Sequence, residues 1–171
     1  APGAGRDGSD GIRVTYQGYE QGSERVVALY PLDGHAESVR LHFDVCFEPD
    51  FQFVKGGKLH GVGPARRVTG GRPRVPEGWS SRIMFQDEGH VSTYFYDQDV
   101  EKLWGAGTLS AERVFLPGHW HHVELETILN TPGEADGLAS IRVDGREVVR
   151  SEGVEFRGTG GPETLIQKFL F

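Results

Sequence analysis

Residues 38–47, SVRLHFDVCF, alternate between an apolar side chain and a charged, polar or small one at every position. Successive side chains of a β-strand point to opposite faces, so this pattern is typical of a strand with one buried face. No stretch of the chain has a convincing 3.6-residue periodicity, and we therefore expect strands rather than long helices. The apolar face of this first strand would carry Val39, Leu41, Phe43, Val45 and Phe47.

Short runs of the same kind recur along the chain, separated by the turn signals PLDG, QDEG, TPGEADG and TGGP. The 25 glycines and 9 prolines fit many short strands joined by turns. Several strands with no helix between them predict a pair of antiparallel sheets or a barrel. The further strand candidates are residues 25–30, 80–86, 90–97, 121–129, 139–145 and 163–171.

The length of 171 residues fits a single domain with a two-layer core. Residues 1–10, APGAGRDGSD, lack a periodic apolar pattern and predict a flexible N-terminal arm. We therefore expect one β-sandwich domain over residues 11–171.

The balance of acidic and basic side chains limits which kinds of molecule the protein is expected to bind. The chain has 18 Lys and Arg against 25 Asp and Glu, a formal net charge of −7, which argues against a nucleic-acid partner. An acidic protein can still hold a locally basic groove for an anionic sugar polymer. No apolar run approaches the roughly 20 residues of a membrane-spanning helix, so we expect no membrane partner either.

Polar side chains concentrate on one face of three segments, residues 53–61, 78–85 and 91–97. Side chains of equal parity share a face of a strand. If the three segments are neighbouring strands, their polar sets merge into one patch that is rich in cations and phenols and poor in carboxylates. This patch would carry Lys58 and His60 from the first segment, Ser80, Arg82, Met84 and Gln86 along the second, and Ser92, Tyr94 and Tyr96 from the third.

Such a patch suits the cleavage of a uronic-acid polymer by β-elimination, in which the C5 proton is removed and the 4-O-linked sugar is expelled. The planar guanidinium of Arg82 could hold the carboxylate while negative charge spreads into it. A base must reach C5 and an acid must protonate the leaving oxygen. Tyr94 or Tyr96 can fill either role if nearby cations favour the phenolate, and Lys58 is itself a candidate base. Hydrolysis would instead want two opposed carboxylates, and no acidic pair stands out on these segments.

The string HWHH at residues 119–122 does not predict a metal site. His119 and His121 would project opposite to His122, and no Cys, Asp or third His stands at a standard zinc spacing. The glycine-rich GGKLHGVG lacks the GK[ST] of a phosphate-binding loop. We expect neither a metal nor another cofactor.

Two levels of resemblance support this interpretation. GHWHHVELET and IRVDGREV resemble segments of concanavalin-like jelly rolls, in which one curved sheet presents a groove to sugars. The stretch from FDVCFEPDFQFVKGGKL through GWSSRIMF and YFYD to GHWHHVELETILNTPGEADG, roughly residues 40–137, resembles polysaccharide lyase family 14. These are alginate and glucuronan lyases with the catalytic pattern Lys-x21-Ser-x-Arg-x11-Tyr-x-Tyr. The pattern stands here as Lys58, Ser80, Arg82, Tyr94 and Tyr96.

The resemblance implies an all-β, concanavalin-like jelly-roll β-sandwich of two antiparallel sheets with a concave carbohydrate-binding groove. It also implies a polysaccharide lyase that cleaves a 1,4-linked polyuronate, alginate or glucuronan, by metal-independent β-elimination with those five catalytic residues. We expect Lys55, His60 and Gln86 to bind the substrate, and His60 to replace or tune the base. We further expect a secreted monomer; the start at Ala1 fits either a mature end after signal-peptide removal or an arbitrary boundary.

Two alternatives remain at this stage. A non-catalytic, lectin-like carbohydrate-binding module would bind a polyuronate without turning it over. A structural adhesion domain of the laminin-G kind would have no affinity for uronates, and it would give no reason for the Lys-Ser-Arg-Tyr-Tyr set.

Overall fold

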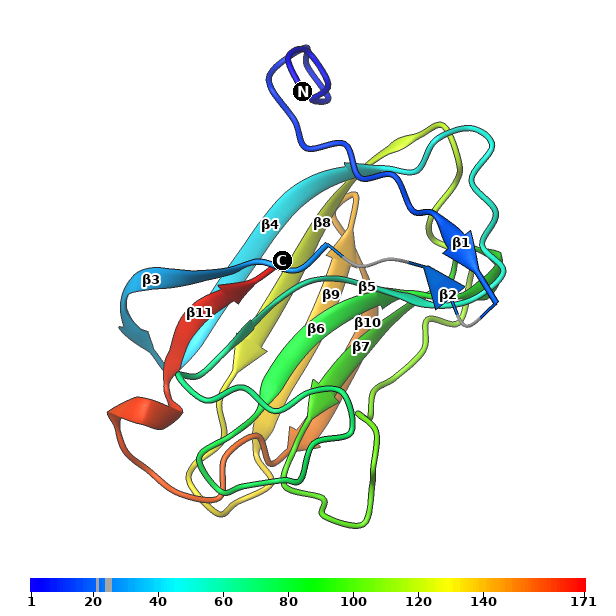
Figure 1. Cartoon of the computed structure of the whole chain (residues 1–171). Helices are drawn as coiled ribbons and strands as arrows, with labels where there is room; N and C mark the ends of the chain where they lie inside the picture. The colour runs from blue at the N-terminus through cyan, green and yellow to red at the C-terminus, as the bar shows by residue number, and fades with distance from the viewer. Residues whose placement is uncertain (21, 24–25) are drawn as a thin grey trace.

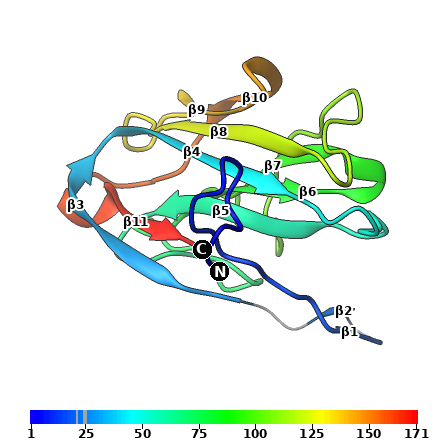
Figure 2. The same ribbon diagram turned by 90° about the horizontal axis from the view of Figure 1, so that it is seen from above.

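Two antiparallel sheets stacked face to face make up the body of the molecule (Figures 1 and 2). The computed structural model describes residues 1–20, 22–23 and 26–171. One sheet has the strand order β10 (Arg146–Val154), β9 (Gly137–Val143), β8 (Trp120–Ile128) and β4 (Ser38–Cys46). The other has the order β3 (Leu29–Ala36), β11 (Ile166–Leu170), β5 (Gly57–Gly63), β6 (Ser80–Phe85) and β7 (Val91–Tyr96).

Neighbouring strands in both sheets are often distant in sequence, as in β4 beside β8 and β11 between β3 and β5. This crossing between layers confirms the expected jelly-roll β-sandwich of two antiparallel sheets. Smaller elements complete the described chain: a two-stranded ribbon of β1 (Gly18–Tyr19) and β2 (Gly22–Ser23), and the 3-10 turns η1 (Asp87–Gly89) and η2 (Pro162–Thr164). No helix in the described residues is long and apolar enough to cross a membrane.

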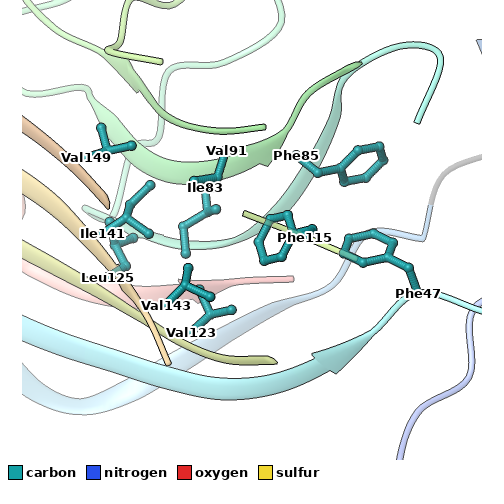
Figure 3. Close-up of a cluster of buried hydrophobic side chains, with 10 residues drawn as sticks. All are labelled: Phe47, Ile83, Phe85, Val91, Phe115, Val123, Leu125, Ile141, Val143 and Val149. Carbon is teal, nitrogen blue, oxygen red and sulfur yellow. The ribbon is translucent and has the colours of Figure 1, made fainter. Parts of the chain in front are cut away.

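The core lies between the two sheets, whose apolar side chains point toward one another (Figure 3). The sequence parity of β4 and β6 predicts which side chains enter it. Leu41 and Phe43 pack against the cluster, and Ile83 has no exposed surface. The buried members of the cluster are Phe47, Ile83, Phe85, Val91, Phe115, Val123, Leu125, Ile141, Val143 and Val149.

The Val-Asp-Gly sequence forms the hairpin between β9 and β10. Asp144 and Gly145 both have positive φ, 52° and 82°, as a two-residue type I′ turn requires. The Asp144 carboxylate also receives hydrogen bonds at 2.8 Å from Nδ1 of His121 and at 2.9 Å from the backbone N–H of His122. His121 is buried, and its Nε2 accepts the N–H of Leu116, so this ring holds a turn and a loop together.

The observed strands differ from the predicted ones in two places. Residue 25 of the expected strand at 25–30 lies outside the described residues, and the strand there is β3, which begins at Leu29 and runs through the predicted turn PLDG. The pairing of β3 with β11 is interrupted there: Ala36 pairs with Ile166 and Pro31 with Lys168, so the residues between Pro31 and Ala36 bulge out of the register. The strand β10 was not predicted at all. The proposed boundary at residue 10 stays a prediction; residues 1–11 are closed by a hydrogen bond from the Gly11 N–H to the Ala1 carbonyl.

Candidate functional site

The three segments with polar faces are adjacent strands of the five-stranded sheet, β5, β6 and β7 in that order. Arg82 lies opposite Tyr94 and Ser80 opposite Tyr96 in the β6–β7 register. The intervening side chains face the other sheet: the Thr93 hydroxyl bonds Ser151 on β10 at 2.8 Å. The parity predicted for β6 and β7 is therefore confirmed, and the polar set lies on the sheet face that points away from the core.

The parity predicted for β5 is wrong after Lys58. Lys58 pairs with Met84, but the register then shifts, and Gly61 rather than His60 lies opposite Arg82. An extra residue in a bulge sends the following side chains to the opposite faces. Gly61 matters there because a Cβ would overlap the Cγ of Arg82 and the carbonyl of Ser81.

His60 consequently lies among aromatic rings and does not share the face of Lys58. Its ring centroid is 4.4 Å from that of Phe43 and 4.6 Å from that of Phe171, and its Nδ1 is buried without a hydrogen bond. Burial, followed by the charge of Arg82, lowers the pKa of His60 to about 4. A neutral imidazole packed in this way is a structural group, and its expected part in substrate binding stays untested.

Arg82 is a buried cation without a carboxylate partner among the described residues. Only 6% of its surface is exposed. Nη1 donates to the carbonyl of Leu59 at 3.1 Å, whereas Nε has no hydrogen-bond partner. Burial, and then the nearby charge of Arg67, lowers the pKa of Arg82 to about 10, so it remains charged at neutral pH. Buried charges normally have a partner, and this one points to an anion supplied from outside.

Arg157 shows what a structural buried arginine looks like in the same protein. It is 4% exposed, yet Nη2 donates to the carboxylate of Glu37 at 3.0 Å. Nε and Nη1 donate to the carbonyl of Asn130 and the hydroxyl of Thr164. Every nitrogen of that guanidinium is used inside the fold, whereas Nε of Arg82 is buried without a hydrogen-bond partner.

The two tyrosines form a hydrogen-bonded pair. Their hydroxyl oxygens are 3.4 Å apart, and each accepts a backbone N–H, Tyr94 from Gly105 at 3.2 Å and Tyr96 from Gly71 at 3.0 Å. Burial and the bond to Tyr96 raise the pKa of Tyr94 to about 12. Burial would also raise the pKa of Tyr96, but the hydrogen bonds and the charge of Lys58 together lower it. The pKa values of the two phenols are therefore shifted in opposite directions, upward for Tyr94 and downward for Tyr96.

Tyr94 is half-buried, while Tyr96 and Ser80 have at most 1% of their surface exposed. The Ser80 hydroxyl donates to the carbonyl of Val68 at 2.7 Å. Lys58 is exposed and holds its Nζ 5.0 Å from the centre of the Tyr94 ring. The structure thus brings all five predicted catalytic residues to one face, with Tyr94 and Lys58 at its surface.

The other residues expected to bind substrate lie at the edge of this set. Gln86 donates from Nε2 to the Ser92 hydroxyl at 2.8 Å, and its amide lies against Gly56. Lys55 is exposed in the connection before β5. Their roles stay predictions.

Sequence reasoning missed Arg74, which covers Tyr96. Its guanidinium carbon lies 4.7 Å from the centre of the Tyr96 ring, and Nη2 donates to the carbonyl of Trp104 at 2.9 Å. The connections 64–79 and 97–119 therefore meet over the ends of β6 and β7 (Figure 1). One available signal was charge: residues 51–76 contain six Lys or Arg and no Asp or Glu.

The side chains of His121 and His122 bond different carboxylates, His121 that of Asp144 and His122 that of Asp44. His122 bonds the Asp44 carboxylate through Nδ1 at 2.9 Å, on the outer side of the other sheet. Within residues 1–20, 22–23 and 26–171, no three His, Cys, Asp or Glu side chains are grouped to hold a metal ion.

The chain is thus a jelly-roll sandwich that carries, on one sheet face, a buried guanidinium without a carboxylate partner among the described residues, beside two hydrogen-bonded phenols. The family model of polysaccharide lyase 14 matches residues 11–167, and the chain belongs to this family. The resemblance found in the sequence is thereby confirmed. None of the curated proteins is significantly similar to the chain in sequence.

Solved structures share the fold. The alginate lyase Aly36B superimposes with a TM-score of 0.71 at 22% identity, over 88% of this chain and 64% of its own. The alginate lyase vAL-1 from Chlorella virus gives 0.64 at 20% identity, over 91% and 77% of the two chains. The PL-14 alginate lyase from Aplysia kurodai gives 0.63 at 20% identity, over 81% and 69%. The chain thus spans 64–77% of the length of these structures, and less than two thirds of Aly36B.

Proposed function

We propose that this protein is a lyase that cleaves a 1,4-linked polyuronate, alginate or glucuronan, by metal-independent β-elimination. The observation that carries the proposal is the charged guanidinium of Arg82, which is 6% exposed, has a buried Nε without a hydrogen-bond partner, and has no carboxylate partner in the described residues. A uronate carboxylate is the group that would complete it. Membership of polysaccharide lyase family 14 supports the same chemistry.

In the proposed reaction Arg82 neutralises the uronate carboxylate, so that the charge released from C5 can spread into it. The C5–H bond and the C4–O bond break, a C4=C5 double bond forms, and the leaving oxygen takes up a proton. Tyr94 is suited to donate that proton because its raised pKa, about 12, keeps the phenol protonated at neutral pH.

Tyr96 is a positioning residue in this scheme. It has no exposed surface but lies 3.4 Å from the Tyr94 oxygen, so it orients that phenol and can restore its proton. The C5 proton passes either to the oxygen of Tyr94 as Tyr94 gives its own proton to a Tyr96 phenolate across this bond, or to the unprotonated amine of Lys58, whose Nζ is 5.0 Å from the centre of the same ring. Replacing Lys58 by Met and Tyr96 by Phe separates the two routes.

The test is the appearance of the unsaturated uronate, which absorbs in the ultraviolet. Folded protein would be incubated with polymannuronate, polyguluronate and glucuronan, each with and without a metal chelator. We expect absorbance to rise on at least one polymer, with the chelator making no difference. Folded protein that leaves all three polymers unchanged would contradict the proposal, and loss of activity in chelator would contradict the metal-independent mechanism.

A second candidate function, a non-catalytic carbohydrate-binding module, is favoured by one observation. Ser80 and Tyr96 are buried and bonded to the backbone of the 64–79 connection, so neither can touch a substrate in this conformation. Binding of a polyuronate without any unsaturated product would support this alternative. We further propose that the protein is secreted and monomeric. Separating cells from medium in a culture of the organism that produces it would test secretion, and light scattering would test the monomer.

A further inference from the structure

The positive charge of this acidic protein is concentrated in one segment. Residues 51–76 hold six of its 18 Lys and Arg and none of its 25 Asp and Glu. The rest of the chain therefore has 12 basic side chains against all 25 acidic ones. A concentration of this kind on a protein of net charge −7 needs a local reason.

Part of this segment forms a hollow of about 220 Å³ in the connection between β5 and β6. Arg66 and Arg72 are exposed and Arg67 is half-buried. The hollow combines guanidinium groups with apolar surface, which suits a sugar acid, with its carboxylate and its C–H face, better than a bare inorganic anion. Its lining residues are Arg66, Arg67, Val68, Arg72, Pro73 and Val75.

The three arginines of this hollow have no carboxylate partner in the described parts of the chain. Arginines of the opposite sheet, in contrast, are each held by a glutamate. These pairs are Arg40–Glu126 at 2.8 Å, Arg142–Glu147 at 3.8 Å, Arg146–Glu112 at 3.1 Å and Arg150–Glu152 at 2.7 Å. In a chain with a surplus of acids, three neighbouring unpaired arginines mark a place for an external anion.

The backbone that surrounds the hollow also bonds residues of the candidate active site. The Val68 carbonyl, in the wall of the hollow, accepts the Ser80 hydroxyl, and Gly71, next to Arg72, donates its N–H to Tyr96. The Cβ of Arg67 lies 3.7 Å from the position of a Cβ on Gly63, on the face of β5 where Gly61 lies opposite Arg82. The charge of Arg67 also reaches Arg82, whose pKa it helps to lower.

We propose that Arg66, Arg67 and Arg72 form a second uronate subsite, which binds the carboxylate of a sugar residue beside the one held by Arg82. This inference rests on the proposed polyuronate substrate. A second subsite makes the protein selective for polymers that carry carboxylates on neighbouring sugar residues, because a single uronate would fill only one of the two cationic sites.

The test compares the variant Arg66→Gln/Arg72→Gln with the matched control Arg142→Gln/Arg146→Gln. Both remove two positive charges from exposed positions, so the net charge changes equally. Native electrophoresis in gels that contain polymannuronate, polyguluronate or glucuronan gives the affinity without requiring turnover. An exposed ion pair contributes up to about a factor of 5 in binding, so we expect the Kd to rise up to about 25-fold for the test variant. The control should bind like the wild type.

Four outcomes bear on the inference, and the last of them separates it from the proposed lyase activity. Equal retardation of the two double variants would overturn the subsite, and so would a wild type that no polyuronate retards. A difference between the variants that persists on the methyl-esterified polymers would overturn carboxylate recognition. Strong retardation of the wild type without unsaturated product would overturn only the lyase activity. If the wild type is active, Arg66→Gln/Arg72→Gln should raise KM while kcat stays within about twofold, since Arg82 and Tyr94 remain.

Discussion

Replacing Arg82 by Met should stabilise the protein while abolishing its activity. The guanidinium is 6% exposed, and burial with the charge of Arg67 lowers its pKa from 12.5 to about 10. Each pKa unit corresponds to about 1.4 kcal/mol. Neutral pH lies below both values, so the group is charged in the folded and unfolded states, and the full cost of about 3 kcal/mol applies.

Methionine has a similar length and no charge. Its introduction removes this cost and the hydrogen bond to the Leu59 carbonyl, a loss of about 1 kcal/mol. We therefore expect the free energy of unfolding to rise by about 1–2 kcal/mol. With a urea m-value of about 2 kcal/mol/M, the unfolding midpoint should rise by about 0.5–1 M. The fluorescence of Trp79, which has no exposed surface, can follow the transition.

Arg157→Met is the matched control, because Arg157 is equally buried but fully bonded. Removing its contacts with Glu37, Asn130 and Thr164 should cost about 2–4 kcal/mol. If Arg82→Met lowered the midpoint as Arg157→Met does, Arg82 would be an ordinary structural residue, and the argument for an external anion would be refuted.

Three further substitutions test other parts of the account. Tyr94→Phe should lower turnover by about 100- to 10,000-fold and the free energy of unfolding by about 1 kcal/mol or less, as steady-state rates and urea titration would show; full turnover would return Tyr94 to the role of a strand residue. Ile83→Ala should cost about 2–5 kcal/mol of stability with unchanged activity per folded molecule, and a benign result would contradict its place in the core. His60→Phe should make the stability less sensitive to acid. Because the pKa of His60 is about 4 in the folded state and 6.5 in the unfolded state, the free energy of unfolding of the wild type should fall by up to about 3 kcal/mol as the pH is lowered from 6.5 to 4. Identical pH profiles of the melting temperatures of the two proteins would contradict this.

The alternation of the sequence was sufficient to predict the two sides of β6 and β7. Ile83 enters the core and Arg82 faces away because a strand has a period of two, whatever its neighbours are. The same rule fails at His60, where the bulge in β5 reverses the parity. A bulge depends on how two strands pair, so the sequence of one strand alone does not reveal it. Gly61 is a local sign of the bulge.

The burial of the site could not be predicted from the sequence for a different reason. An open groove would leave Arg82 and both tyrosines exposed, but the connections 64–79 and 97–119 cover Ser80 and Tyr96. Such connections have no periodicity from which their path could be predicted. Gly71 bonds Tyr96 from a backbone with φ of 71°, a conformation that its sequence permits but does not specify.

A crystal structure of Tyr94→Phe with a bound uronate trisaccharide would test the central claim most directly. The account predicts a carboxylate oxygen within hydrogen-bond distance of Nε of Arg82, the donor that the fold leaves without a partner. The oxygen linked to C4 of the same sugar should face the position of the missing phenol oxygen. A trisaccharide bound with its carboxylates away from Arg82, or a guanidinium that stays sealed with Nε unbonded in the complex, would contradict it.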